Sequence, residues 1–235
     1  MMSYVLISAE PSWGHTSGLD TMLGKLGLTR RLESASASAA SGLVVVDWRG
    51  PHVNALATRG LSTCTGWRTR IAVVPSDRGM SVLGELRPHF DSVLTAPVDE
   101  CALCEALAAH SFDAVSRSEH DQLGAKVLEL ACGDVPTAAH LLDLILDTNR
   151  STVAAMRHAF GLAQWDALAS AAHRVAGSAR MLDCHGLTAL LMRLEAAARD
   201  RQTALAGAVL AIVVVSLERL DASLQIAREE SATQN

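Results

Sequence analysis

The chain has 235 residues, of which 49% are hydrophobic, and a formal net charge of −5 at pH 7, which suits a globular chain of one or two domains. The acidic balance and an aromatic content of 3% exclude a basic nucleic-acid surface and the stacking platforms of single-strand binders. Five cysteines without disulfide-framework spacing favour a reducing compartment, so we expect a cytoplasmic protein.

Strands and helices alternate in the first half of the sequence. Short apolar runs predict strands at Tyr4–Ser8, Leu43–Asp47, Ile71–Val74 and Ser92–Thr95, and Leu19–Leu26 predicts a helix. This alternation predicts a parallel sheet with helices on both faces.

Two motifs in this half resemble a receiver domain across roughly residues 3–110. The apolar run from Val44 ends in Asp47, with Pro51 four residues later, and residues 94–99 resemble the closing strand and loop. The resemblance implies a flavodoxin-like, doubly wound parallel sheet of five strands, with Asp47 at the phosphate-accepting position.

The resemblance also shows what this half lacks. It places the acidic pair that holds Mg²⁺ on Ser8 and Ala9, and the usual lysine on Ala96. Mg²⁺ is held by carboxylates and phosphate oxygens, so the loss of these groups predicts a degenerate receiver, a pseudo-receiver in which Asp47 is inert.

A polar stretch with weak periodicity at residues 111–120 predicts a linker. We therefore expect a pseudo-receiver domain at residues 1–110, a helical domain at 121–230 and a tail at 231–235.

The second half is helical throughout. Apolar spacing and capping residues predict helices at Asp121–Cys132, from Asp134 to about Phe160, at Trp165–Asp183, around Leu187–Leu194 and at Thr203–Glu229. Short connections between them predict an up-and-down four-helix bundle with a short leading helix. The longest apolar run, Ala204–Leu217, is shorter than the ~20 residues that a membrane span needs, so we expect a core helix and no membrane segment.

His173 is the candidate reactive residue. The apolar stripe of its helix, Leu168 to Leu182, lies opposite to it, and at ~100° per residue Ala176, Gly177 and Arg180 return to the side of His173. We therefore expect the imidazole on an open face.

Residues 119–229 resemble a histidine phosphotransfer (HPt) domain. The resemblance rests on His173 with Val175, Gly177 and Ser178 behind it, and on the leucine-rich stretch Leu190–Arg199. It implies that His173 accepts a phosphoryl group as a labile N–P bond, and that the small Gly177 lets a receiver approach. The usual lysine three residues after the histidine is Ala176 here; Arg180 or Arg174 is the candidate replacement for its charge.

The receiver and HPt order is similar to the end of a bacterial hybrid sensor histidine kinase. We expect His173 to take phosphoryl from a receiver of an upstream kinase and to pass it to a response regulator. The chain has no ATP-binding loop, and Mg²⁺ is expected only through an active receiver partner. The alternative is a scaffold in which neither domain is phosphorylated. A redox or zinc role for Cys101 and Cys104 lacks a second ligand pair.

Overall fold

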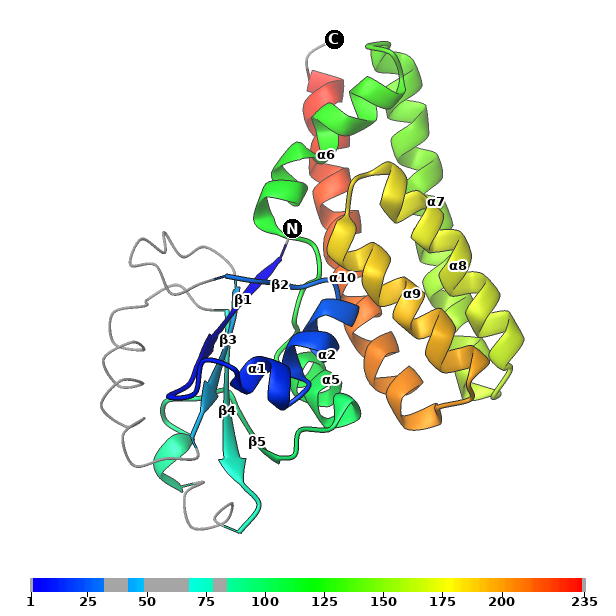
Figure 1. Ribbon diagram of the computed structural model, residues 1–235. Coiled ribbons are helices and arrows are strands. Elements are labelled where there is room, and N and C mark those ends of the chain that lie inside the picture. Colours follow the sequence, from blue (N-terminus) through cyan, green and yellow to red (C-terminus); the bar gives the residue numbers. More distant parts are fainter. Residues whose placement is uncertain (1, 32–41, 49–67, 78–83, 234–235) are drawn as a thin grey trace. The chain divides into compact units, whose positions relative to one another are not determined.

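The computed structural model describes residues 2–31, 42–48, 68–77 and 84–233 (Figure 1). The chain divides into two compact units, with the boundary between Phe112 and Asp113. This boundary lies within residues 111–120, the stretch expected as a linker, and each unit is described by itself.

The first unit is built on a parallel sheet. Its strands are β1 (Ser3–Ile7), β2 (Thr29–Arg30), β3 (Gly42–Asp47), β4 (Thr69–Pro75) and β5 (Ser92–Ala96), in the order β2-β1-β3-β4-β5. This is the flavodoxin-like order, so the predicted fold class is confirmed. The central strand β3 is buried along its whole length, as expected for an all-parallel sheet covered on both faces. Strand β2 was not predicted, because its two residues are polar and exposed and carry no apolar pattern.

Helices α1 (Trp13–Thr16), α2 (Leu19–Lys25) and α5 (Glu100–Ala109) lie on one side of the sheet (Figure 1). The Tyr4 hydroxyl of β1 donates to Asp20 Oδ1 of α2 at 2.6 Å, which fixes α2 to this side. Val44, Val46, Ala72 and Val74 alternate to the other side, where they pack against Leu86 and Phe90. Asp47 and Ser8 therefore lie at the carboxyl edge of the sheet, beside the start of α1.

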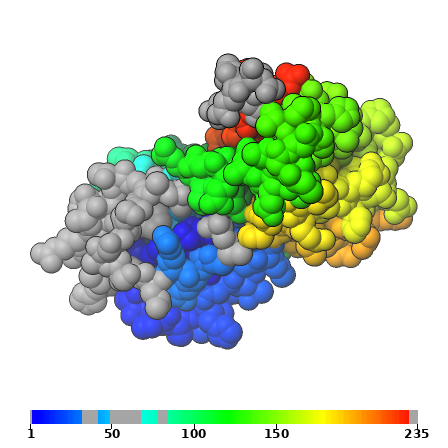
Figure 2. All heavy atoms as spheres, turned by 90° about the horizontal axis from the view of Figure 1, so that it is seen from above, coloured from blue at the N-terminus to red at the C-terminus, as the bar shows by residue number. Residues whose placement is uncertain are grey.

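The second unit contains α6 (Arg117–Leu130), α7 (Val135–Gly161), α8 (Trp165–Met181), α9 (His185–Arg199) and α10 (Thr203–Thr233). α8 packs on α7 and α9, and α10 closes the bundle by packing on α9 and α7; α6 leans on α10 and α7. Three-residue connections at 162–164, 182–184 and 200–202 make successive helices antiparallel. The predicted four-helix bundle with a leading helix is the observed arrangement. Figure 2 shows α7, α8 and α9 side by side, from light green to orange.

α6 begins earlier than the sequence analysis expects. Ser116 and Glu119 form a capping box, in which Glu119 N donates to Ser116 Oγ (3.3 Å) and Ser116 N donates to Glu119 Oε2 (2.7 Å). The helix therefore starts at Arg117, inside the stretch expected as a linker. The Ser-x-x-Glu spacing was the signal for this start.

α10 is the core helix of the bundle. By length and composition it could cross a membrane, but 61% of its apolar window is buried inside the protein. Its stripe of Val209, Val213, Leu217, Leu220 and Leu224 is at most 1% exposed. The burial is that of a bundle helix, as the sequence analysis expects.

Candidate functional site

His173 lies in the middle of α8, and its imidazole points out of the bundle. The side chain is 73% exposed, while Leu168, Ala172 and Val175 on the opposite side are at most 2% exposed. The expected orientation of the helix is therefore observed. Solvent and a partner protein can both reach the ring.

A buried carboxylate on the neighbouring helix holds the ring. His173 Nδ1 lies 3.0 Å from Glu195 Oε2, and the Glu195 side chain is only 10% exposed. An ionised carboxylate only accepts hydrogen bonds, so this contact places the ring proton on Nδ1. The lone pair then lies on Nε2, which is the nucleophilic nitrogen.

Glu195 also binds a cation. Its second oxygen, Oε1, forms an ion pair with the Arg199 guanidinium one turn later on α9. The Arg199 side chain is 66% exposed, so it covers the outer side of the buried carboxylate. His173, Glu195 and Arg199 thus form one continuous chain of contacts, and a buried carboxylate needs such partners.

One of the three residues expected on the open face of α8 with His173 is buried instead. Gly177 and Arg180 are exposed, as expected, but Ala176 is 2% exposed and belongs to the packed side of α8. The reason is geometric, because a residue three positions on lies ~60° behind the histidine around the helix, whereas the fourth lies ~40° ahead. The expectation that Ala176 shares the open face is wrong.

Gly177 leaves space beside the imidazole. Among the described residues, a Cβ at Gly177 would meet no atom of another element within 4 Å. Ser178 is half-buried, and Arg174 is exposed next to His173. Arg180 reaches α9, where its Nη2 lies 3.9 Å from Met192 Sδ.

Sequence reasoning missed Glu195 as a site residue. The signal was present, because Glu195 continues the apolar stripe of Leu187, Leu191 and Leu194, where a carboxylate is out of place unless it has a partner. Arg199 follows at the i+4 position of an ion pair.

The degenerate receiver site lies at the carboxyl edge of the sheet. Asp47 ends β3 and is 4% exposed, and Ser8 Oγ donates to its Oδ2 at 2.7 Å. Ala9 is exposed beside Ser8, and Ala96 ends β5. The residues that the receiver resemblance singled out thus gather at one edge. In the part of the chain that the structure describes, no three His, Cys, Asp or Glu residues are grouped to hold a metal.

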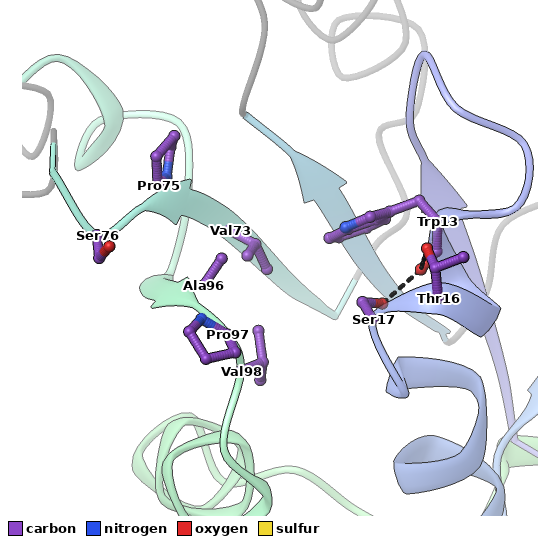
Figure 3. A pocket seen from close by; sticks show the side chains of 9 residues that line it. All are labelled: Trp13, Thr16, Ser17, Val73, Pro75, Ser76, Ala96, Pro97 and Val98. Atoms are coloured by element: carbon purple, nitrogen blue, oxygen red, sulfur yellow. Dashed lines mark hydrogen bonds between the residues drawn. The ribbon is translucent and has the colours of Figure 1, made fainter.

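A pocket of about 380 Å³ occupies the neighbouring part of this edge (Figure 3). Figure 3 shows Val73 and Ala96 facing the Trp13 side of the pocket, with Pro97 and Val98 below them. Its described lining, drawn from α1 and from the ends of β4 and β5, carries no charged side chain: Trp13, Thr16, Ser17, Val73, Pro75, Ser76, Ala96, Pro97 and Val98. The described lining therefore offers no cation to a phosphoryl group.

The cysteine pair in α5 has the wrong environment for redox chemistry. Burial, and then the Glu105 carboxylate, raises the pKa of the Cys101 thiol, and Cys104 is buried. Reactive cysteines need a lowered pKa, so the surroundings of Cys101 do not favour a thiolate.

The bundle with its exposed, carboxylate-bound histidine defines a class of protein, a helical module with an accessible imidazole on its surface. Residues 140–230, which include His173, Glu195 and Arg199, match the family model described as Hpt domain. No curated protein and no solved structure matches the chain. The chain therefore carries an Hpt domain, which supports a histidine phosphotransfer role in two-component signalling.

Proposed function

We propose that the protein is a phosphorelay intermediate: His173 accepts a phosphoryl group from the aspartate of a receiver elsewhere and passes it to a response regulator. The observation that carries the proposal is the exposed imidazole whose Nδ1 is held by the buried Glu195 carboxylate. This arrangement leaves Nε2 as a nucleophile on an open surface, next to the clear space at Gly177.

The transfer step follows from these contacts. The Nε2 lone pair attacks the phosphorus of the partner's aspartyl phosphate, the bond between phosphorus and the aspartate oxygen breaks, and the aspartate leaves as a carboxylate. His173 becomes a phosphoimidazolium whose positive charge and Nδ1 proton face Glu195. Glu195 stabilises this charge as it develops, which is the role of the carboxylate in a carboxylate–imidazole pair. The return reaction reverses each step.

The first unit takes a docking or regulatory role in this proposal. Asp47 is buried and holds the Ser8 hydroxyl, and the positions of the acidic pair and the lysine are Ser8, Ala9 and Ala96. The Mg²⁺ for each transfer comes with the receiver partner, since positioning and charge neutralisation dominate phosphoryl transfer. We place the protein in the cytoplasm, as a module of a hybrid histidine kinase system.

The test is transfer from a receiver domain of known activity, charged with labelled acetyl phosphate and Mg²⁺. We expect an acid-labile, base-stable label on the full chain that is lost in His173→Gln and retained in Asp47→Asn. An unlabelled wild-type chain, or a label that survives in His173→Gln, overturns the proposal. The first of these results supports the alternative of an interaction scaffold.

A further inference from the structure

A phosphoryl group on His173 brings about two negative charges to the surface of α8. On α8 itself, Arg174 is exposed next to His173 in the sequence, and Arg180 follows two turns after the histidine. Position 176 is a buried alanine, and the Arg180 guanidinium is directed to Met192 on α9. A further cation for the phosphoryl group can come from the neighbouring helix α9.

Arg199 is the cation that the contacts connect to the ring. Its guanidinium pairs with Glu195 Oε1, and the other oxygen of the same carboxylate holds His173 Nδ1. A guanidinium has five N–H donors in a planar fork, so it can keep Glu195 and still donate to phosphoryl oxygens. The Arg199 side chain is 66% exposed, so solvent reaches it while it pairs with Glu195.

We propose that Arg199 binds the phosphoryl oxygens on His173 and replaces the cation that α8 lacks at position 176. This inference rests on the proposed function. Glu195 has two roles in this proposal. One carboxylate oxygen orients the imidazole, and the other holds the Arg199 guanidinium in an ion pair before the phosphoryl group arrives. The site is thereby organised in advance, which favours transfer since little reorganisation is needed during the reaction.

The experiment compares Arg199→Gln and Arg199→Lys in the full chain. The probes are potassium phosphoramidate, a small phosphoryl donor, and a receiver domain charged with acetyl phosphate and Mg²⁺. We expect Arg199→Gln to lower the rate of His173 phosphorylation from both donors by about 10-fold, the effect of one charge-assisted hydrogen bond, and Arg199→Lys to recover most of it. In ³¹P NMR, the phosphohistidine signal should shift in Arg199→Gln.

Two controls separate direct contact from indirect effects. Arg157→Gln removes a cation of another exposed ion pair, with Glu218 at 3.1 Å, and should leave the rates unchanged. The ¹⁵N shifts of the unphosphorylated His173 ring should stay the same in Arg199→Gln, because Glu195 still holds Nδ1.

Each other result overturns the inference. It fails if the rates of Arg199→Gln equal those of the wild type, if Arg199→Lys is as slow as Arg199→Gln, or if the ring ¹⁵N shifts move, which means that Arg199 acts through Glu195. It also fails if Arg174→Gln or Arg180→Gln is slower than Arg199→Gln. In these cases a wild-type label that disappears in His173→Gln leaves the proposed function standing, whereas failure of that function shows as an unlabelled wild-type chain.

Discussion

Glu195 is a carboxylate on the apolar side of α9, and its position sets the chemistry of a ring on another helix. We expect Glu195→Gln to slow phosphorylation of His173 by about 10-fold, because a neutral amide neither fixes the Nδ1–H tautomer nor stabilises the imidazolium that forms. The tautomer is read from ring ¹⁵N shifts and the rate from phosphoramidate labelling. Glu218→Gln, in an exposed ion pair, is the matched control. A wild-type rate in Glu195→Gln would show that the contact has no part in the reaction.

At Gly177, a larger residue should stabilise the helix but obstruct the approach of a receiver. Helix interiors favour other residues over glycine by about 0.5–1 kcal/mol, and the space around Gly177 is open. Gly177→Gln should therefore raise the free energy of unfolding by about 0.5 kcal/mol. It should also slow transfer from a receiver by about 10-fold, while labelling by phosphoramidate stays unchanged.

The control for this variant is Ala167→Gln, an exposed position near the start of α8. It should change neither rate. If receiver transfer in Gly177→Gln is as fast as in the wild type, the clear space beside His173 is not where the partner approaches.

Three helices of the bundle end at a residue that has a left-handed backbone conformation but is not glycine. Ala163, Asp183 and Arg201 each follow a helix with a left-handed backbone, at φ 52°, 57° and 53°. At the first of these ends, Gln164 N donates to Ala159 O and Ala163 N donates to Phe160 O, as in a Schellman motif. We expect Ala163→Gly to stabilise the fold by about 0.5–1 kcal/mol, since glycine adopts this conformation without steric cost.

Chemical denaturation measures this change. The control is Ala154→Gly on the exposed side of α7, which should lose about 1 kcal/mol because its backbone is helical. If both variants are destabilised equally, the left-handed conformation at Ala163 carries no cost.

Asp221 of α10 contacts Asn149 of α7, and its partly buried carboxylate is disfavoured in the charged form. Burial raises the pKa of Asp221, and the Asn149 amide, whose Nδ2 donates to Asp221 Oδ1 at 2.8 Å, lowers it in part. A raised pKa in the folded state means that the contribution to stability is complete below the unfolded pKa and is lost as the pH rises through the folded pKa. Asp221→Asn should therefore raise Tm at pH 7 and lose this gain near pH 3.

The matched control is Asp143→Asn, whose carboxylate forms an exposed ion pair with Arg228. It should show no gain at pH 7. An equal gain of Asp221→Asn at both pH values would mean that its cause is packing and not ionisation.

The elements differ in how far their sequence determines them. β3 and α9 are predictable because the apolar run of one and the leucine stripe of the other are long and lie in the core. β2 and α1 are too short to show a hydrophobic periodicity, so their structure depends on the elements that pack against them and not on local sequence. The orientation of His173 follows from one helix, but its contact with Glu195 joins residues 22 positions apart. Such a contact depends on how two helices pack, which no periodicity specifies.

At the scale of the whole molecule, residues 113–116 belong to the helical unit and not to a free connection. Asp113 is 1% exposed, and its Oδ2 lies 3.1 Å from His120 Nε2, whose Nδ1 lies 2.8 Å from Ser223 Oγ on α10. Ala114 N donates to Ser216 Oγ, also on α10, at 2.9 Å. These buried and partly buried contacts tie the start of the unit to its core helix.

The last prediction compares two fragments of the chain, one starting at residue 111 and one at residue 121, where the sequence analysis starts the helical domain. The longer fragment keeps the contacts of Asp113, Ala114 and Glu119, whose Oε1 accepts from His185 N at 3.1 Å. Because each buried hydrogen bond contributes about 1 kcal/mol and an orphaned partner costs more, the shorter fragment should be less stable by at least about 3 kcal/mol. Urea unfolding followed by circular dichroism measures the difference, and phosphoramidate labelling of His173 tests whether the longer fragment keeps its site. Equal stability of the two fragments would show that residues 111–120 are dispensable for the bundle.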